Sequence, residues 1–273
     1  MKSYQRIIKY GAIAFAVLLI VSIFGGIISA FSSISIFTSS SKDAPGNMRE
    51  YDVRQDMENL EIELTGSKLE IRTGEKFALS ANHKYLSVKD TGGVLVLKET
   101  KKVWGLSSKT PTIILTVPED MVFGKIDIQS GAGTIKAEAL TTEELRIELR
   151  AGEMEIESLT ATNSSKLECG AGEMSIDSGE LANLTLNLGA GDIELRSRLT
   201  GNSNLDYGVG ELDLTLCGRE EDYSITVDRG IGEARINGEK VTEDEIYGHG
   251  PNSIAVDGGV GELKVEYDNI NWK

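Results

Sequence analysis

Apolar and polar residues alternate along most of the chain after residue 51, in short runs separated by glycine. Alternation with a period of two predicts β-strands that bury one face. In the second half the runs share a motif, a glycine followed by a polar and usually acidic residue, as in GAGT, GAGE, GAGD and GVGE. The spacings of 19, 20, 19, 19, 22 and 29 residues between the aligned glycines indicate a repeat architecture. These glycines are Gly133, Gly152, Gly172, Gly191, Gly210, Gly232 and Gly261.

The phase of the alternation changes at each of these glycines. Apolar residues stand five residues and one residue before the glycine, and again two and four residues after it. A slip of one residue turns a strand over unless the chain bends there, so each glycine is predicted to be a corner. The pattern predicts an all-β protein, a parallel β-solenoid with coils of about 19–20 residues, in which successive coils stack in chain order. The small Ala or Val before each corner is predicted to join the internal ladders.

The solenoid is predicted to cover residues 51–273, in three parts. Residues 51–125 alternate less regularly and are predicted to form irregular N-terminal coils, with turns at Gly66, Gly74 and Gly92-Gly93. Residues 126–268 carry the glycine repeats. The last repeat contains an insertion at 237–253, which is predicted to protrude as an inserted loop.

The N-terminal 50 residues have a different pattern. Three basic residues and no acidic residue precede an apolar stretch without charges, which predicts a cytoplasmic tail at 1–10 and a transmembrane anchor at 11–37. A linker at 38–50 follows. The chain is therefore expected to be a single-pass protein of the cell membrane, with the domain after the linker outside the cell. A cleaved signal peptide is the alternative, because Ile28-Ser29-Ala30 could serve as a cleavage site.

The charge of the chain limits its partners. The net charge is −15, and residues 42–273 hold 25 basic and 43 acidic side chains. Such a surface repels phosphate backbones, so nucleic-acid binding is disfavoured, whereas cations or basic partners are attracted.

The repeats also place acidic residues in register. Stacking aligns Glu153, Glu173, Asp192, Glu211 and Glu233, each directly after its corner glycine, as one line of carboxylates. A solvated face explains this line without any ligand, because neighbouring carboxylates about 5 Å apart repel by only about 0.8 kcal/mol in water. Weak binding of Ca²⁺ or Mg²⁺ is the alternative, since these ions prefer carboxylate oxygens.

No motif in the sequence points to catalysis. The acidic residues recur in every repeat, whereas glycan-cleaving enzymes need a local cluster, and no GxSxG or HExxH motif occurs. We therefore expect no enzyme activity, no catalytic residue and no cofactor. Cys169 and Cys217 fall in different apolar columns, so both are predicted to be buried and unpaired.

The order of these features resembles a bacterial family of candidate-adhesin domains of unknown function. The resemblance lies in the basic start, the single apolar span, the passage TIILTVPEDMVFGKIDIQSGAGTI and the GxG repeats, and it covers roughly residues 50–268. It implies a β-solenoid in the cell envelope that binds a protein or cell-wall component as an adhesin or scaffold. A sensory or regulatory partner of an envelope-stress system and, less favoured, a glycan-active enzyme stay open as alternatives.

Overall fold

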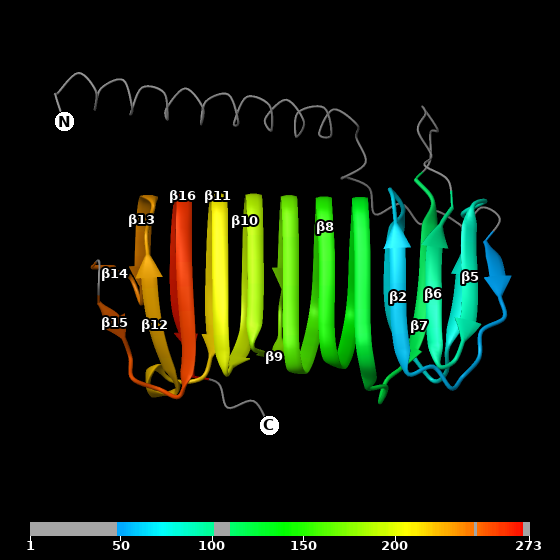
Figure 1. Ribbon diagram of the computed structural model, residues 1–273, viewed down its shortest axis with the longest axis horizontal. Coiled ribbons are helices and arrows are strands. Elements are labelled where there is room, and N and C mark those ends of the chain that lie inside the picture. The colour runs from blue at the N-terminus through cyan, green and yellow to red at the C-terminus, as the bar shows by residue number, and fades with distance from the viewer. Residues whose placement is uncertain (1–47, 101–109, 243–244, 270–273) are drawn as a thin grey trace, which may run out of the picture. The chain divides into compact units, whose positions relative to one another are not determined.

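Residues 48–100, 110–242 and 245–269 are described by a computed structural model, in which they form an all-β solenoid (Figure 1). Parallel strands stack side by side along one axis. In the middle of the stack each residue lies beside the residue nineteen positions away in the next coil, so that Ile193 is flanked by Met174 and Leu212. This register confirms the predicted coil length in this part of the chain.

The strands fall into three groups along the chain. The central coils consist of β8 (Phe123–Ile176), β9 (Gly179–Ala182), β10 (Leu184–Thr200) and β11 (Asn202–Cys217). The strands before them are β1 (Arg49–Tyr51), β2 (Asn59–Leu64), β3 (Lys68–Gly74), β4 (Ala78–Ala81), β5 (Leu86–Thr91), β6 (Val94–Glu99) and β7 (Thr112–Pro118). After them follow the 3₁₀ helix η1 (Glu220–Asp222), β12 (Tyr223–Asp228), β13 (Ile231–Ile236), β14 (Glu239–Lys240), β15 (Ile246–Tyr247) and β16 (Asn252–Asp268).

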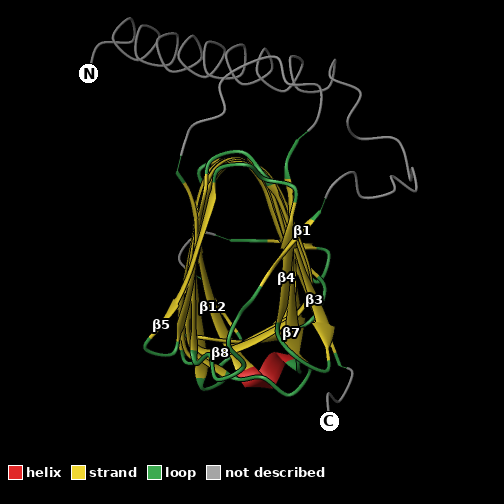
Figure 2. Ribbon diagram, turned by 90° about the vertical axis from the view of Figure 1, so that its right-hand side faces the viewer, coloured by secondary structure: helices red, strands yellow, loops and turns green. Residues whose placement is uncertain are grey.

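Viewed along the stack, the coils form two walls that meet at a ridge (Figure 2). We call the strand segments before the corner the first wall and those after it the second wall. A short parallel sheet forms part of the base, where β9 lies between residues 159–161 and 198–200. Apolar side chains fill the interior, because the alternation of each strand turns one face inward.

The corner requires glycine at the aligned position for two reasons. Gly191 has a φ of +131°, in the region that side chains with a Cβ rarely adopt. A Cβ at Gly191 would also overlap the carbonyl oxygen of Gly172 in the neighbouring coil. One detail of the prediction was wrong, because the apolar residue before each corner glycine does not join the buried core. It lies at the ridge where the walls meet and is partly buried, or in the case of Ile231 61% exposed.

The two cysteines are buried, as predicted, and Cys169 is a free thiol. Cys169 lies beside Leu188 in the core, whereas Cys217 lies beside Asp268. Burial raises the pKa of Cys169 to about 11, so this thiol is unreactive at neutral pH. Met154 and Met174 are also fully enclosed core residues.

The prediction that all coils stack in chain order was wrong at the C-terminal end. The last coil, β16, lies between β11 and the coil formed by β12 and β13. The corner glycines follow the same order, since Gly261 packs on Gly210 and Gly232 packs on Gly261. The insertion makes this exchange possible, because it is long enough to bring the chain back by one coil.

The N-terminal end shows a matching exchange. The coil of β2 and β3 lies between β8 on one side and the coil of β6 and β7 on the other. These coils are therefore more regular than the sequence indicated, but they also stack out of chain order.

Antiparallel strands cover both ends of the stack. At the N-terminal end β5 pairs with β6, and β4 pairs with β7 and β1. At the C-terminal end the insertion does not only protrude, since β14 pairs with β13 and β15 pairs with β12. Such short strands protect the edges of a solenoid from pairing with other chains.

The predicted span 11–37 lies outside the described residues, as do the tail 1–10 and most of the linker 38–50. Among the residues that are described, none belongs to a helix long and apolar enough to cross a membrane.

Candidate functional site: the acidic outer wall

The outer face of the second wall carries three parallel rows of polar side chains. They stand one, three and five residues after the corner glycine, because the residues between them point into the core. In the coils of Gly152, Gly172, Gly191 and Gly210 these rows are rich in carboxylates, and we call this surface the acidic wall. Its acidic residues are Glu153, Glu155, Glu157, Glu173, Asp177, Asp192, Glu194, Glu211 and Asp213.

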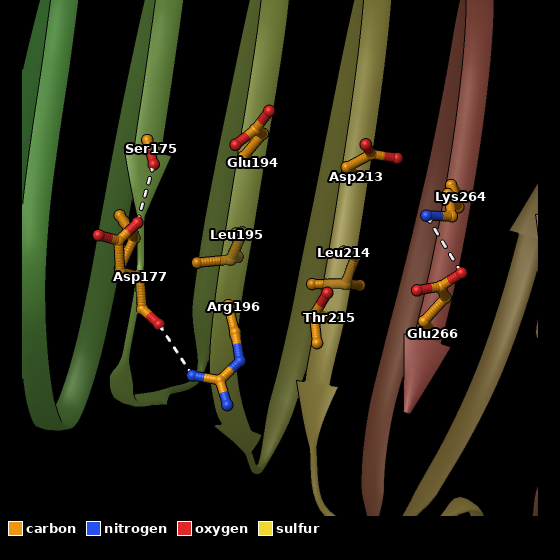
Figure 3. A pocket seen from close by; sticks show the side chains of 11 residues that line it. Ser175, Asp177, Glu194, Leu195, Arg196, Asp213, Leu214, Thr215, Lys264 and Glu266 are labelled. Atoms are coloured by element: carbon orange, nitrogen blue, oxygen red, sulfur yellow. Dashed lines mark hydrogen bonds and ion pairs between the residues drawn. The ribbon is translucent and has the colours of Figure 1, made fainter. Parts of the chain in front are cut away.

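Part of the acidic wall forms a shallow groove of about 520 Å³. Figure 3 shows its side chains on four neighbouring strand segments, with Glu194 and Asp213 side by side in the middle. Arg196 donates a hydrogen bond to the backbone carbonyl of Asp177 at 3.2 Å and pairs with Asp268. Lys264 pairs with Glu266 at 3.1 Å on the far side. The groove therefore has an anionic centre and basic residues near its edges.

Most carboxylates in the centre of the acidic wall form no ion pair, and among them Asp213 stands in register with Lys264 of β16. Within the described residues, Glu173, Asp192, Glu194, Glu211 and Asp213 form no ion pair with Lys or Arg. All five side chains are exposed, so water screens their mutual repulsion. The parallel ladder of the sheet sets their backbone register, so the carboxylates recur at regular spacing along the stack.

The first coil of the acidic wall is electrostatically different. Burial, followed by the neighbouring Glu155 carboxylate, raises the pKa of Glu153. The hydrogen bond from Lys136, followed by that involving Glu153, lowers the pKa of Glu155. The pKa values of two acids on one strand are thus shifted in opposite directions, because burial dominates at Glu153 and the Lys136 hydrogen bond dominates at Glu155.

The five candidate metal ligands form a line, but not the predicted one. Asp192 lies directly between Glu173 and Glu211, as expected. Glu233 does not follow Glu211, because Glu262 of the interposed strand β16 lies between them. Glu233 also forms ion pairs with Arg235 and Lys240. Nowhere in residues 48–100, 110–242 and 245–269 do three His, Cys, Asp or Glu side chains form a group that could hold a metal ion.

A second groove, of about 470 Å³, lies on the first wall near the C-terminal end. Its polar residues include Asp206, Asp257 and Asp228, which stand in register on three neighbouring strands. The neighbours of Asp257 depend on the position of β16 between β11 and β12, which the order of the chain does not indicate.

Sequence reasoning missed a buried polar cluster around Glu99 at the N-terminal end of the corner ridge. The Glu99 carboxylate accepts hydrogen bonds from the Thr65 amide at 2.7 Å and from the Ser67 hydroxyl. His83 Nε2 lies 3.5 Å from the same carboxylate, and its Nδ1 accepts the Tyr85 amide at 2.9 Å. The one available signal was the position of Glu99, which continues the inward alternation of Leu95 and Leu97.

Stacked parallel coils with a glycine corner and an exposed polar wall define a β-solenoid domain. The chain matches the Toastrack DUF4097 family over residues 53–246 and belongs to this family, which confirms the resemblance found in the sequence. No curated protein matches the chain.

Solved structures include similar proteins. A candidate adhesin from Bacteroides fragilis is 19% identical, with 80% of this chain and 96% of that chain covered and a TM-score of 0.50, which supports the same fold. A candidate cell adhesion protein from Clostridium sporogenes is 19% identical, covers 81% and 99%, and has a TM-score of 0.35. A candidate lipid-binding protein from Parabacteroides distasonis is 13% identical, covers 81% and 97%, and has a TM-score of 0.32.

Proposed function

We propose that this protein is a non-catalytic binding protein of the bacterial cell envelope, anchored in the membrane by residues 11–37. In this proposal the solenoid lies outside the membrane and binds a basic partner, a protein or a cell-wall component, on the acidic wall. The observation that carries the proposal is the group of five exposed carboxylates that form no ion pair with Lys or Arg among the described residues, in register on one parallel sheet. The candidate adhesin with the same fold is compatible with a binding role.

Electrostatics favours this partner class. Carboxylates fixed about 5 Å apart along the stack add their potentials, which attracts a cationic chain and repels an anionic one. The attraction must weaken with salt, since all of these side chains are exposed. The acids of the groove repeat from coil to coil, which favours a binding surface over a catalytic cluster around one reacting atom.

The test is the binding of a labelled oligolysine peptide to the purified full chain in detergent, with oligoglutamate as the comparison. The test variant neutralises the wall with Glu173→Gln, Asp192→Asn, Glu194→Gln and Asp213→Asn. Its affinity for oligolysine is expected to fall by about tenfold or more, because each exposed ion pair contributes roughly 0.5 kcal/mol.

The matched control neutralises four exposed acids of the first wall, with Glu144→Gln, Asp206→Asn, Asp228→Asn and Asp257→Asn. It changes the net charge equally and is expected to keep most of the affinity. Equal losses in both variants would mean that only the net charge matters, and the acidic wall would not be the binding surface.

Calcium separates cation binding from screening. We expect CaCl₂ to raise the melting temperature no more than NaCl at equal ionic strength, since the wall lacks the backbone carbonyls and tight loop of calcium sites. A larger rise with calcium that Glu173→Gln with Asp192→Asn removes would assign the wall to divalent cations instead.

The membrane orientation has its own test. Protease added to intact protoplasts should digest residues 42–273, because the basic residues precede the apolar span. Full protection of a C-terminal tag would contradict the proposed location.

A further inference from the structure

Within the described residues the C-terminal part of the solenoid pairs with the rest through a single strand, and the buried Tyr223 hydroxyl also donates a hydrogen bond to the Cys217 carbonyl at 2.7 Å. We call Tyr223–Asp268 the C-terminal unit. In it β12 and β13 pair with β16, and β15 and β14 pair with β12 and β13. In the described chain only β16 pairs with β11, and none of the other strands of the unit does. Figure 1 shows β16 in red between β11 and β12.

The seam between β11 and β16 is fitted by the size of the facing side chains. Tyr207 of β11 is buried and lies beside Gly258 of β16. A Cβ at Gly258 would lie only 2.6 Å from the Tyr207 hydroxyl oxygen. The equivalent residues of the central coils include Leu149, Cys169 and Leu188. The edge of β11 is therefore shaped for the coil that carries Gly258.

Further contacts hold the two ends of this seam. The Gly218 amide donates to the Asp268 carbonyl at 2.9 Å, and the Ser253 amide donates to the Gly201 carbonyl at 2.9 Å. Arg196 pairs with the Asp268 carboxylate across the seam. On one side of these contacts lie Arg196 and Gly201 of the solenoid body and Gly218 of the connection before β12. On the other side lie Ser253 and Asp268 of β16.

Only five residues, 218–222, connect β11 to the C-terminal unit. They include η1 and Gly218, whose φ is +142°. A short connection of this kind can open by rotation about a few bonds, and the unit then leaves as one piece.

We propose that the edge of β11 is a docking surface for the C-terminal unit of a second copy of this chain, so that two copies exchange these units in a domain-swapped dimer. The seam is chemically identical whether the unit comes from the same chain or from its neighbour. The bare edge of β11 pairs with any matching coil until it is covered, and the Gly258 fit selects this unit. Closure within one chain dominates in dilute solution, because a short linker gives an effective concentration of about 1 mM.

The first test uses full-length chains with two different tags. Thr215 and Glu266 are register partners across the seam and point outward on neighbouring strands (Figure 3). One chain carries Thr215→Cys and the other Glu266→Cys, and the two are refolded together in detergent and then oxidised. We expect a disulfide between the two tagged chains whose yield rises with the protein concentration during refolding. Mixing the chains after folding should give no such product.

The matched control replaces Thr215→Cys with Glu194→Cys, which lies one coil further from Glu266. It should lose the cross-linked product, because the seam does not bring these positions together. The proposal is overturned if the mixed chains give no disulfide at any concentration while a chain with both Thr215→Cys and Glu266→Cys cross-links within itself.

The second test removes residues 219–221 from the connection. The shortened chain cannot close on its own β11, so the molecular mass should double while the β-sheet circular dichroism is kept. Adding Gly258→Leu should shift the mass towards that of one chain, because the collision with Tyr207 weakens the seam. A shortened chain that stays monomeric, or a dimer that survives Gly258→Leu, would overturn the exchange.

Discussion

The coils between Phe123 and Cys217 stack in the order in which they occur along the chain, whereas the coils at both ends do not. In the middle, each coil meets copies of its own pattern on both sides. At the N-terminal end, the coil β2–β3 lies between the next coil along the chain, β6–β7, and the more distant β8. At the C-terminal end, β16 lies between the preceding coil, β12–β13, and the more distant β11. The comparison shows that the repeat determines the shape of a coil, while individual side chains determine which coil it packs against.

Both exchanges leave the same kind of end. The outermost parallel coil is β6–β7 at one end and β12–β13 at the other, and antiparallel strands cover each of them. An open parallel edge would pair with other chains, so the stack ends in irregular strands that offer a poor template.

Gly191→Val should have the largest effect on stability, because it acts in the middle of the stack. The substitution strains a backbone with φ of +131° and forces a Cβ into the carbonyl oxygen of Gly172. We expect a loss of roughly 3 kcal/mol or more in the free energy of unfolding, measured by urea denaturation. Gly92→Val is the control at the N-terminal end, since its φ is +63° but its Cβ meets nothing within 4 Å. Equal losses would mean that coil stacking adds nothing at the corner.

Gly258→Leu tests the fit that orders the coils at the C-terminal end. The added side chain would collide with Tyr207, so we expect a loss of about 2 kcal/mol, typical of overpacked cores. The double variant Tyr207→Leu with Gly258→Leu should recover part of this loss, because leucine at this position is tolerated next to cysteine in the central coils. Thermal unfolding of the single and double variants measures the recovery. No recovery would show that size matching does not select the neighbour.

Glu99→Gln tests the polar cluster that closes the corner ridge at the N-terminal end. The amide keeps the shape, but its one oxygen cannot accept from both the Thr65 amide and the Ser67 hydroxyl through separate oxygens, as the carboxylate does. We expect a loss of about 1–2 kcal/mol in chemical denaturation, since the site is buried. Glu63→Gln, which breaks only the exposed pair with Lys98, should cost less than about 0.5 kcal/mol. Similar losses would mean that the cluster is no stronger than a surface pair.

The smallest effect on stability is expected from Glu153 and Glu155, the acids of the first coil of the acidic wall. Folding raises the pKa of Glu153, so the folded protein binds the Glu153 proton more tightly than the unfolded chain does. The stability that the protonated form contributes is therefore lost as the pH rises through the raised pKa. The pKa of Glu155 is lowered, so its contribution is present at neutral pH and is lost as the pH falls through the folded pKa. Glu153→Gln should therefore stabilise the fold at pH 7, and Glu155→Gln should destabilise it. Melting curves at pH 7 and pH 4 check both signs, and shifts of the same sign at pH 7 would contradict the assignment.

Much of the candidate site could be predicted, because it follows from the repeat. The outward position after each corner glycine is a local property of the strand, so the line through Glu173, Asp192 and Glu211 was read correctly. The neighbours of Glu233 were not, since they depend on which coil lies beside β13. The groove itself also depends on Arg196 and Lys264, which come from coils far apart in the chain.

By itself the sequence determined the all-β class, the coil of nineteen residues, the glycine corner and the inward columns. These are local consequences of alternation and of backbone freedom at glycine. Only the tertiary structure decided the stacking order at the ends, the strands formed by the insertion and the buried cluster at Glu99. Coils with the same pattern offer nearly the same hydrogen bonds, so the choice between neighbours depends on small differences in side-chain size across the seam, such as Tyr207 against Gly258, which appear only when the coils are packed together.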